Sequence, residues 1–161
     1  MKNSRISGLV RGLALGALLV SLSASAFDLT DTDGKRHRLA DYKGRWVVVN
    51  FWATWCTPCI AEIPEIAEFA RAHPKDVVVL GVALDVEDEA KVRQFAKKIG
   101  HGYPLVLGDD KVEGQLGKVK GLPTTVIYDP GGKRIFDHLG RVTKKQLEES
   151  TRGPAHSAAA S

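Results

Sequence analysis

The stretch FWATWCTPCIAEIPE, residues 51–65, decides the fold of this chain, because it joins an apolar run to two closely spaced cysteines. Cys56 and Cys59 are the only cysteines among the 161 residues. The preceding run, RWVVVNFWA, is almost continuously apolar, which is typical of a strand buried on both faces of a sheet. We expect a helix to begin near Cys56, with Pro58 in its first turn, where a missing backbone N–H does no harm.

The first 26 residues have the pattern of a secretory signal peptide. A basic start with Lys2, Arg5 and Arg11 precedes an apolar run of about 15 residues that ends in Ala24-Ser25-Ala26. This run is shorter than the roughly 20 residues of a membrane-spanning helix, so an uncleaved membrane anchor is the second interpretation. We predict cleavage near Ala26 and a soluble periplasmic protein.

The charge of the chain argues against a nucleic-acid-binding protein. The predicted signal segment holds three of the 23 basic residues and none of the 19 acidic ones, so the remainder is almost neutral. No basic stripe is visible along it. Export also places the two cysteines in an oxidising compartment, where thiols tend to pair.

Three uses of the cysteine pair are conceivable. As a structural staple, a four-residue ring contributes only about 2 kcal/mol of loop entropy, against about 4.7 kcal/mol for a hundred-residue loop. A closed zinc site needs four ligands, and the histidines are scattered and read as ordinary surface or loop residues, although a Cys-Cys-His site built across the fold stays open as an alternative. The redox use is favoured, because the Cys-x-x-Cys spacing at a helix start lowers the pKa of the first thiol, and the thiolate is the nucleophile of disulfide exchange. The histidines are His37, His73, His101, His138 and His156.

The rest of the chain alternates strand and helix patterns. The Asp33-Gly34 turn predicts a small hairpin at the start of the mature protein. The runs DVVVLGVALDV and YPLVLGDD predict strands, EDEAKVRQFAKKIG a helix, KVEGQLGKVKGLP a short helix or irregular link, TTVIYDPGGKRIFDHLG two strands around a turn, and TKKQLEES a last helix. We therefore predict a signal peptide at 1–26, one α/β domain at 27–150 and a disordered tail at 151–161. With Cys-x-x-Cys after the first core strand, the pattern favours a thioredoxin-like fold.

Two distant motifs carry a family resemblance. VVVNFWATWCTPCIAEIP and GLPTTVIYDPGGK, in this order, closely resemble thiol–disulfide oxidoreductases of the TlpA/ResA group, which are exported thioredoxin-fold proteins. The resemblance spans most of the chain from Phe27 to about Glu149. It implies a central mixed β-sheet flanked by helices, with an N-terminal β-hairpin and an inserted strand-helix element.

The resemblance also assigns roles to residues. It implies that Cys56 is the attacking thiol, that Cys59 is the resolving thiol, and that Pro123 is a cis-proline facing the disulfide. A cis turn there leaves the Leu122 backbone free to pair with an extended substrate segment. The implied substrate-binding residues are Trp55, Thr57, Pro58, Leu122 and Thr124.

One position departs from ordinary thioredoxin. Where thioredoxin has a buried aspartate, six residues before the first cysteine, this chain has Asn50, which cannot exchange a proton at working pH. The TlpA/ResA group instead has a glutamate three residues after the second cysteine, and Glu62 matches it. On a helical wheel Glu62 falls within the apolar arc, whereas Glu65 and Glu68 fall outside it. We predict a raised pKa and a proton-shuttle role for Glu62; the alternative is a rim position that favours the helix start.

The favoured function is a reductase of disulfides in other exported proteins. By resemblance its substrates include apocytochrome c or a metal-site assembly protein, and a membrane thiol–disulfide protein supplies electrons. An oxidase that donates its disulfide uses the same residues, and a metal-carrier or binding module is a further alternative. A peroxidase is disfavoured, because Ala53 and Val49 stand where peroxiredoxins have threonine and proline. We expect no cofactor beyond the Cys56–Cys59 disulfide, no nucleic-acid partner, and a monomer.

Overall fold

The computed structural model describes residues 27–84 and 88–152. The predicted signal peptide and residues 153–161 of the predicted tail lie outside the described residues, so the predicted domain bounds stay a prediction. None of the helices in the described part of the chain is long and apolar enough to cross a membrane.

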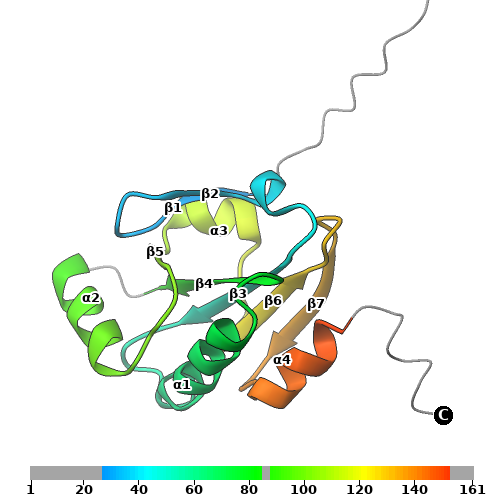
Figure 1. Cartoon of the computed structure of the whole chain (residues 1–161). Helices are drawn as coiled ribbons and strands as arrows, with labels where there is room; N and C mark the ends of the chain where they lie inside the picture. Colours follow the sequence, from blue (N-terminus) through cyan, green and yellow to red (C-terminus); the bar gives the residue numbers. More distant parts are fainter. Residues whose placement is uncertain (1–26, 85–87, 153–161) are drawn as a thin grey trace, which may run out of the picture.

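A five-stranded mixed sheet forms the middle layer, with the strand order β5-β4-β3-β6-β7 (Figure 1). The central strand β3 (Trp46–Trp52) pairs in parallel with β4 (Val77–Ala83) and antiparallel with β6 (Thr124–Tyr128). The edges are β5 (Leu105–Leu107), parallel to β4, and β7 (Arg134–Leu139), antiparallel to β6. The almost continuous apolar run noted in the sequence is thus the central strand, which is buried on both faces.

Within residues 27–84 and 88–152, four α-helices flank the sheet. They are α1 (Thr57–Ala72), α2 (Glu89–Lys98), α3 (Asp110–Leu116) and α4 (Lys144–Ser150). The last three begin at polar N-caps, whose side-chain oxygens accept a backbone N–H of the first turn and so satisfy a donor that has no partner within the helix. In Figure 1, α1 and α4 lie below the sheet and α3 lies above it.

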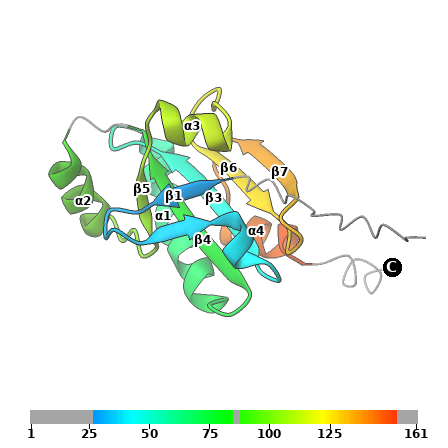
Figure 2. The same ribbon diagram turned by 90° about the horizontal axis from the view of Figure 1, so that it is seen from above.

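The predicted N-terminal hairpin is present. Its strands β1 (Asp28–Thr30) and β2 (Arg36–Arg38) pair antiparallel and lead into a short 3-10 helix, Leu39–Tyr42. Seen from above, the hairpin crosses over the sheet with α3 beside it (Figure 2). With the added α2 and β5 between β4 and α3, the architecture confirms the predicted mixed sheet, flanking helices, hairpin and inserted elements.

The core has two sides, because successive residues of a strand point to opposite faces. Val47, Val49 and Phe51 pack with the hairpin and α3 on the upper face. Val48 and Trp52 pack with α1, α2 and α4 on the lower face. Asn50 lies between Val48 and Trp52 on the lower face. It is polar and fully buried against α1, which places a hydrogen-bonding group at the centre of the domain.

Candidate active site

The two cysteines are joined by a disulfide at the junction of β3 and α1. Cys56 is the N-cap of α1, and Pro58 lies in the first turn, as the sequence predicts. Cys56 keeps 4% of its surface exposed, whereas Cys59 is fully buried. An attacking thiol therefore reaches Cys56 first, and Cys59 is shielded behind it.

Residues from two loops surround this pair. The Leu122–Pro123 peptide bond is cis, and Leu122 packs against the apolar cluster that contains both cysteines. Trp55, the residue immediately before Cys56, has 71% of its surface exposed. The fold thus brings the second sequence motif to the first across about 65 residues of chain, as the resemblance implies.

The predicted substrate-binding residues differ in their placement. Thr57 and Pro58 are exposed beside Trp55, and Leu122 is half-buried. Thr124 is only 4% exposed, and its hydroxyl donates to the Gly121 carbonyl at 2.8 Å. Thr124 therefore shapes the cis-proline turn from inside and does not present its side chain at the surface.

Glu62 lies fully buried on the lower face of the sheet, within the apolar arc of α1. Its carboxylate accepts two hydrogen bonds, from Asn50 Nδ2 to Oε1 at 2.7 Å and from the Val142 backbone N–H to Oε2 at 2.8 Å. Glu65 and Glu68, which the helical wheel placed outside the arc, are half-buried and exposed. The rim alternative for Glu62 is wrong.

Burial raises the pKa of Glu62 from 4.5 to about 7, because the charged form loses its hydration. The two hydrogen bonds and the positive charge of Arg141 act in the opposite direction, since they favour the carboxylate. Glu62 therefore changes protonation near neutral pH, which suits a group that accepts and returns a proton during thiol chemistry.

The structure adds partners that the sequence did not indicate. Val142 donates its backbone N–H to Glu62 from a segment 80 residues further along the chain. Because every residue except proline has this N–H, the residue type does not reveal the contact. His37 is also buried, contrary to the prediction that each histidine is a surface or loop residue. It bonds to Asp31 and Tyr42, so it anchors the N-terminal hairpin.

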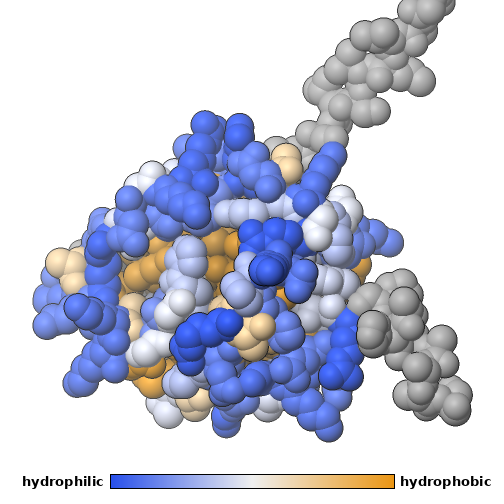
Figure 3. All heavy atoms as spheres, in the orientation of Figure 1, coloured by the Kyte–Doolittle hydropathy of each residue, from blue (hydrophilic) through white to orange (hydrophobic). Residues whose placement is uncertain are grey.

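Among residues 27–84 and 88–152, no three His, Cys, Asp or Glu side chains gather in a way that could hold a metal ion. The surface seen in the orientation of Figure 1 is largely hydrophilic, and apolar residues show as a band at the level of the sheet (Figure 3). The candidate working groups are the Cys56–Cys59 disulfide and the buried Glu62 carboxyl.

These features define a thioredoxin-fold protein that works through a dithiol–disulfide pair. The chain belongs to the AhpC/TSA family, whose family model matches residues 20–134. It is 37% identical over 135 residues to the thiol-disulfide oxidoreductase ResA of Geobacillus thermodenitrificans, covering 83% of this chain and 76% of that protein. It is 39% identical over 127 residues to ResA of Bacillus subtilis, covering 78% and 70%.

Solved structures of similar proteins share this fold. The exposed lipoprotein thioredoxin Etrx1 of Streptococcus pneumoniae superimposes with a TM-score of 0.67 and 32% identity, covering 77% of this chain and 96% of that chain. StoA of Bacillus subtilis gives a TM-score of 0.65 and 26% identity, covering 76% and 93%. The chain is thus a thiol–disulfide oxidoreductase of the ResA type, with Cys56 and Cys59 as its pair.

Proposed function

We propose that this protein is an exported reductase of disulfides in other exported proteins, such as apocytochrome c or a metal-site assembly protein. The observation that carries the proposal is the buried Glu62 carboxyl, three residues after Cys59 on α1, together with a pair in which only Cys56 is accessible. The reductase direction is favoured because the described part of the chain carries no large helical insertion of the kind typical of exported oxidases.

In the reduced protein the Cys56 thiolate attacks a substrate disulfide. A mixed disulfide forms between Cys56 and one substrate sulfur, and the other substrate sulfur leaves as a thiolate. Cys59 then attacks Cys56 Sγ, which releases the second substrate sulfur and restores the Cys56–Cys59 disulfide. Two electrons pass to the substrate, and the protein ends oxidised.

Glu62 serves the second step. Cys59 is fully buried, and burial in apolar surroundings disfavours its thiolate. Glu62 lies three residues further along α1, on the same side of the helix, and accepts the proton of Cys59 as that sulfur attacks. On re-reduction the same carboxyl returns a proton to the leaving Cys59.

The same reasoning suggests the surroundings of the reaction. The basic and apolar start of the chain favours export, and Etrx1, one of the similar structures, is an exposed lipoprotein. An oxidising compartment does not re-reduce the pair, so a membrane thiol–disulfide protein must supply electrons. We propose no cofactor beyond the disulfide and no nucleic-acid partner.

The deciding experiment is the reduction potential of the Cys56–Cys59 couple, measured by equilibration with a defined thiol buffer. A reductase should have a value below roughly −220 mV, whereas a value near roughly −120 mV identifies a strong oxidant and overturns the proposal. A failure to form the disulfide at any poise would instead favour the metal-carrier alternative.

Trapping identifies the substrate. The variant Cys59→Ser should accumulate mixed disulfides through Cys56, because the resolving step is blocked. The matched variant Cys56→Ser should accumulate few, since Cys59 is fully buried. Equal trapping by the two variants would contradict the assignment of Cys56 as the attacking thiol.

A further inference from the structure

Glu62 is fully buried, so a proton that it takes from Cys59 needs a route to solvent. Its two hydrogen-bond partners cannot provide one. The Asn50 amide and the Val142 N–H are both donors, and neither accepts a proton at ordinary pH. Thr125, which bonds to Asn50 at 3.3 Å, lies beyond the same amide. The exit must therefore lie on another side of the carboxyl.

The neighbouring strand offers such a side. Asn50 lies opposite Gly81 in the pairing of β3 with β4, so the two share the lower face of the sheet, against which α1 packs. A Cβ on Gly81 would come within 2.2 Å of His101 Nε2 and 2.9 Å of the Tyr103 ring, because these two rings fill the space over the glycine. The ring centroids of His101 and Tyr103 are only 3.9 Å apart. The aromatic pair thus lies over the residue that pairs with Asn50, the hydrogen-bond partner of Glu62.

Three polar atoms in this region make no hydrogen bond within the described part of the chain. They are Asn50 Oδ1, the Tyr103 hydroxyl and His101 Nε2, and all three are buried. Buried polar atoms of this kind usually bind ordered water. Burial raises the pKa of Tyr103, and the negative charge of Glu62 adds to this effect.

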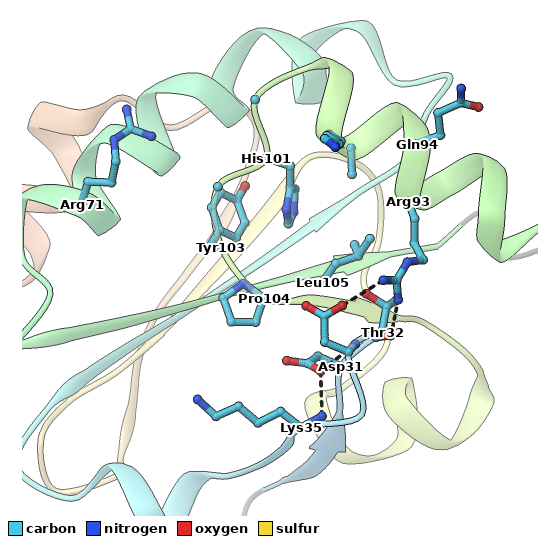
Figure 4. Close-up of a pocket in the computed structure, with 15 residues that line it drawn as sticks. Asp31, Thr32, Lys35, Arg71, Arg93, Gln94, His101, Tyr103, Pro104 and Leu105 are labelled. Atoms are coloured by element: carbon cyan, nitrogen blue, oxygen red, sulfur yellow. Dashed lines mark hydrogen bonds and ion pairs between the residues drawn. The ribbon is translucent and has the colours of Figure 1, made fainter.

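The same two rings reach the outside of the domain. Tyr103 and His101 line an open pocket of about 1010 Å³ between the N-terminal hairpin and α2. Figure 4 shows the two rings side by side at this pocket, above Pro104 and Leu105. Tyr103 is 9% exposed and lines this pocket, while its hydroxyl is buried.

We propose that Tyr103 and His101 form the proton path between Glu62 and solvent, with bound water joining Glu62 to the Tyr103 hydroxyl. This proposal rests on the proposed role of Glu62 in the resolving step. The Glu62 carboxyl gives its proton to the bridging water, and Tyr103 accepts a proton and releases its own. The His101 ring accepts that proton at the buried Nε2 and releases its Nδ1 proton to water in the pocket. Glu62 ends as carboxylate, one proton enters solvent, Tyr103 ends unchanged, and His101 returns to its first tautomer by proton exchange with water.

The charges around the path suit transit. Burial lowers the pKa of His101 to about 4, so its ring is neutral at pH 7 and does not retain the proton. The charged groups that face Glu62 are Glu65 of α1 and Arg141 before α4, which pair with each other at 2.8 Å. His138 lies opposite Thr125 in the register of β6 and β7, beyond the Asn50 amide that separates Thr125 from Glu62.

The test separates proton release from thiol chemistry. Reduced protein is mixed with excess dithiobis(nitrobenzoate), whose coloured product thiolate stays ionised at neutral pH, in weak buffer with an indicator dye. Each molecule then releases two coloured thiolates, and the proton from Cys59 must enter solvent. In wild-type protein the proton should appear together with the second thiolate.

In Tyr103→Phe we expect the second thiolate at close to the wild-type rate and proton release delayed about tenfold or more. The control Tyr128→Phe removes a hydroxyl on the opposite face of the sheet and should show no delay. His101→Ala should show the same delay and recover with added imidazole, which enters from the pocket; this variant also serves if Tyr103→Phe fails to fold.

Proton release that coincides with the second thiolate in both variants would overturn the path. A delay in His101→Ala that imidazole does not relieve would also overturn it, since the histidine would then act only on packing. Failure of the proposed resolving step looks different, because wild-type protein would then release no second thiolate, and the reductase direction is decided separately by the reduction potential of the Cys56–Cys59 couple.

Discussion

Replacing Glu62 by Gln should make the stability of the folded protein less dependent on pH. The carboxyl has a pKa of about 7 in the folded protein and 4.5 as its ordinary value. At about 1.4 kcal/mol for each pH unit, this difference corresponds to about 3 kcal/mol. Because the folded pKa is the higher one, this stability is present below pH 4.5 and is lost as pH rises to 7. Gln has no such loss.

Urea unfolding of both proteins from pH 4 to pH 8, with the disulfide intact, measures the effect. The free energy of unfolding of Glu62→Gln minus that of wild type should grow by about 3 kcal/mol over this range. His101 acts in the opposite direction, because its pKa of about 4 lies below 6.5 and its contribution is lost as pH falls. It is present in both proteins and cancels in the difference.

Glu68→Gln is the matched control, since Glu68 lies on the same helix but faces solvent. The hydrogen bond with Lys144 lowers its pKa below the ordinary value of 4.5, so its difference from wild type should change little between pH 6 and pH 8. A flat difference for Glu62→Gln over pH 5 to 8 would refute the raised pKa. The proton-shuttle role would then lose its physical basis.

Three further changes have defined outcomes. Trp55→Ala should slow reduction of a protein disulfide but not of a small disulfide, with an unchanged melting temperature, because 71% of Trp55 is exposed; equal rates on the protein substrate would contradict this. His37→Leu should lower the free energy of unfolding in urea by about 2–3 kcal/mol, since buried Asp31 loses a hydrogen-bond partner; an effect below about 0.5 kcal/mol would argue against the network. In thermal unfolding, Gly81→Ala should lower the free energy of unfolding by about 1–3 kcal/mol, because the new Cβ meets the His101 ring. The control Gly114→Ala, in open space on α3, should raise it by about 0.5–1 kcal/mol. Equal effects of the two substitutions would contradict the close packing over Gly81.

Local patterns predicted most of the fold. The apolar run before Cys56 became the central strand because only a strand covered on both faces tolerates so many consecutive apolar residues. The family resemblance indicates Glu62, and helical periodicity supports it independently because it reports the face of a helix directly. Pro123 was placed by resemblance, and its contact with the cysteine region comes from the path of the chain between two distant motifs.

Other features depend on contacts that no local pattern encodes. His37 is buried because the hairpin closes on the 3-10 helix. Its neighbours in the sequence are charged, so the local pattern resembles an exposed segment and does not indicate this burial. The aromatic pair over Gly81 depends on a glycine in one strand and two rings that precede the next. A glycine within an apolar strand is the one available signal, because it marks a close approach by another group.

The last helix belongs to the redox site although it carries no redox residue. The Val142 N–H that favours ionisation of Glu62 lies immediately before α4, and α4 is held against α1 by the contact of Lys144 with Glu68. Arg141, in the same segment, both pairs with Glu65 and lowers the pKa of Glu62 by its charge. Burial alone would therefore raise the pKa of Glu62 further than it does. Docking of α4 supplies part of the opposing effect. This balance keeps the pKa of the Glu62 carboxyl near neutral pH, where it can both take a proton from Cys59 and give it back.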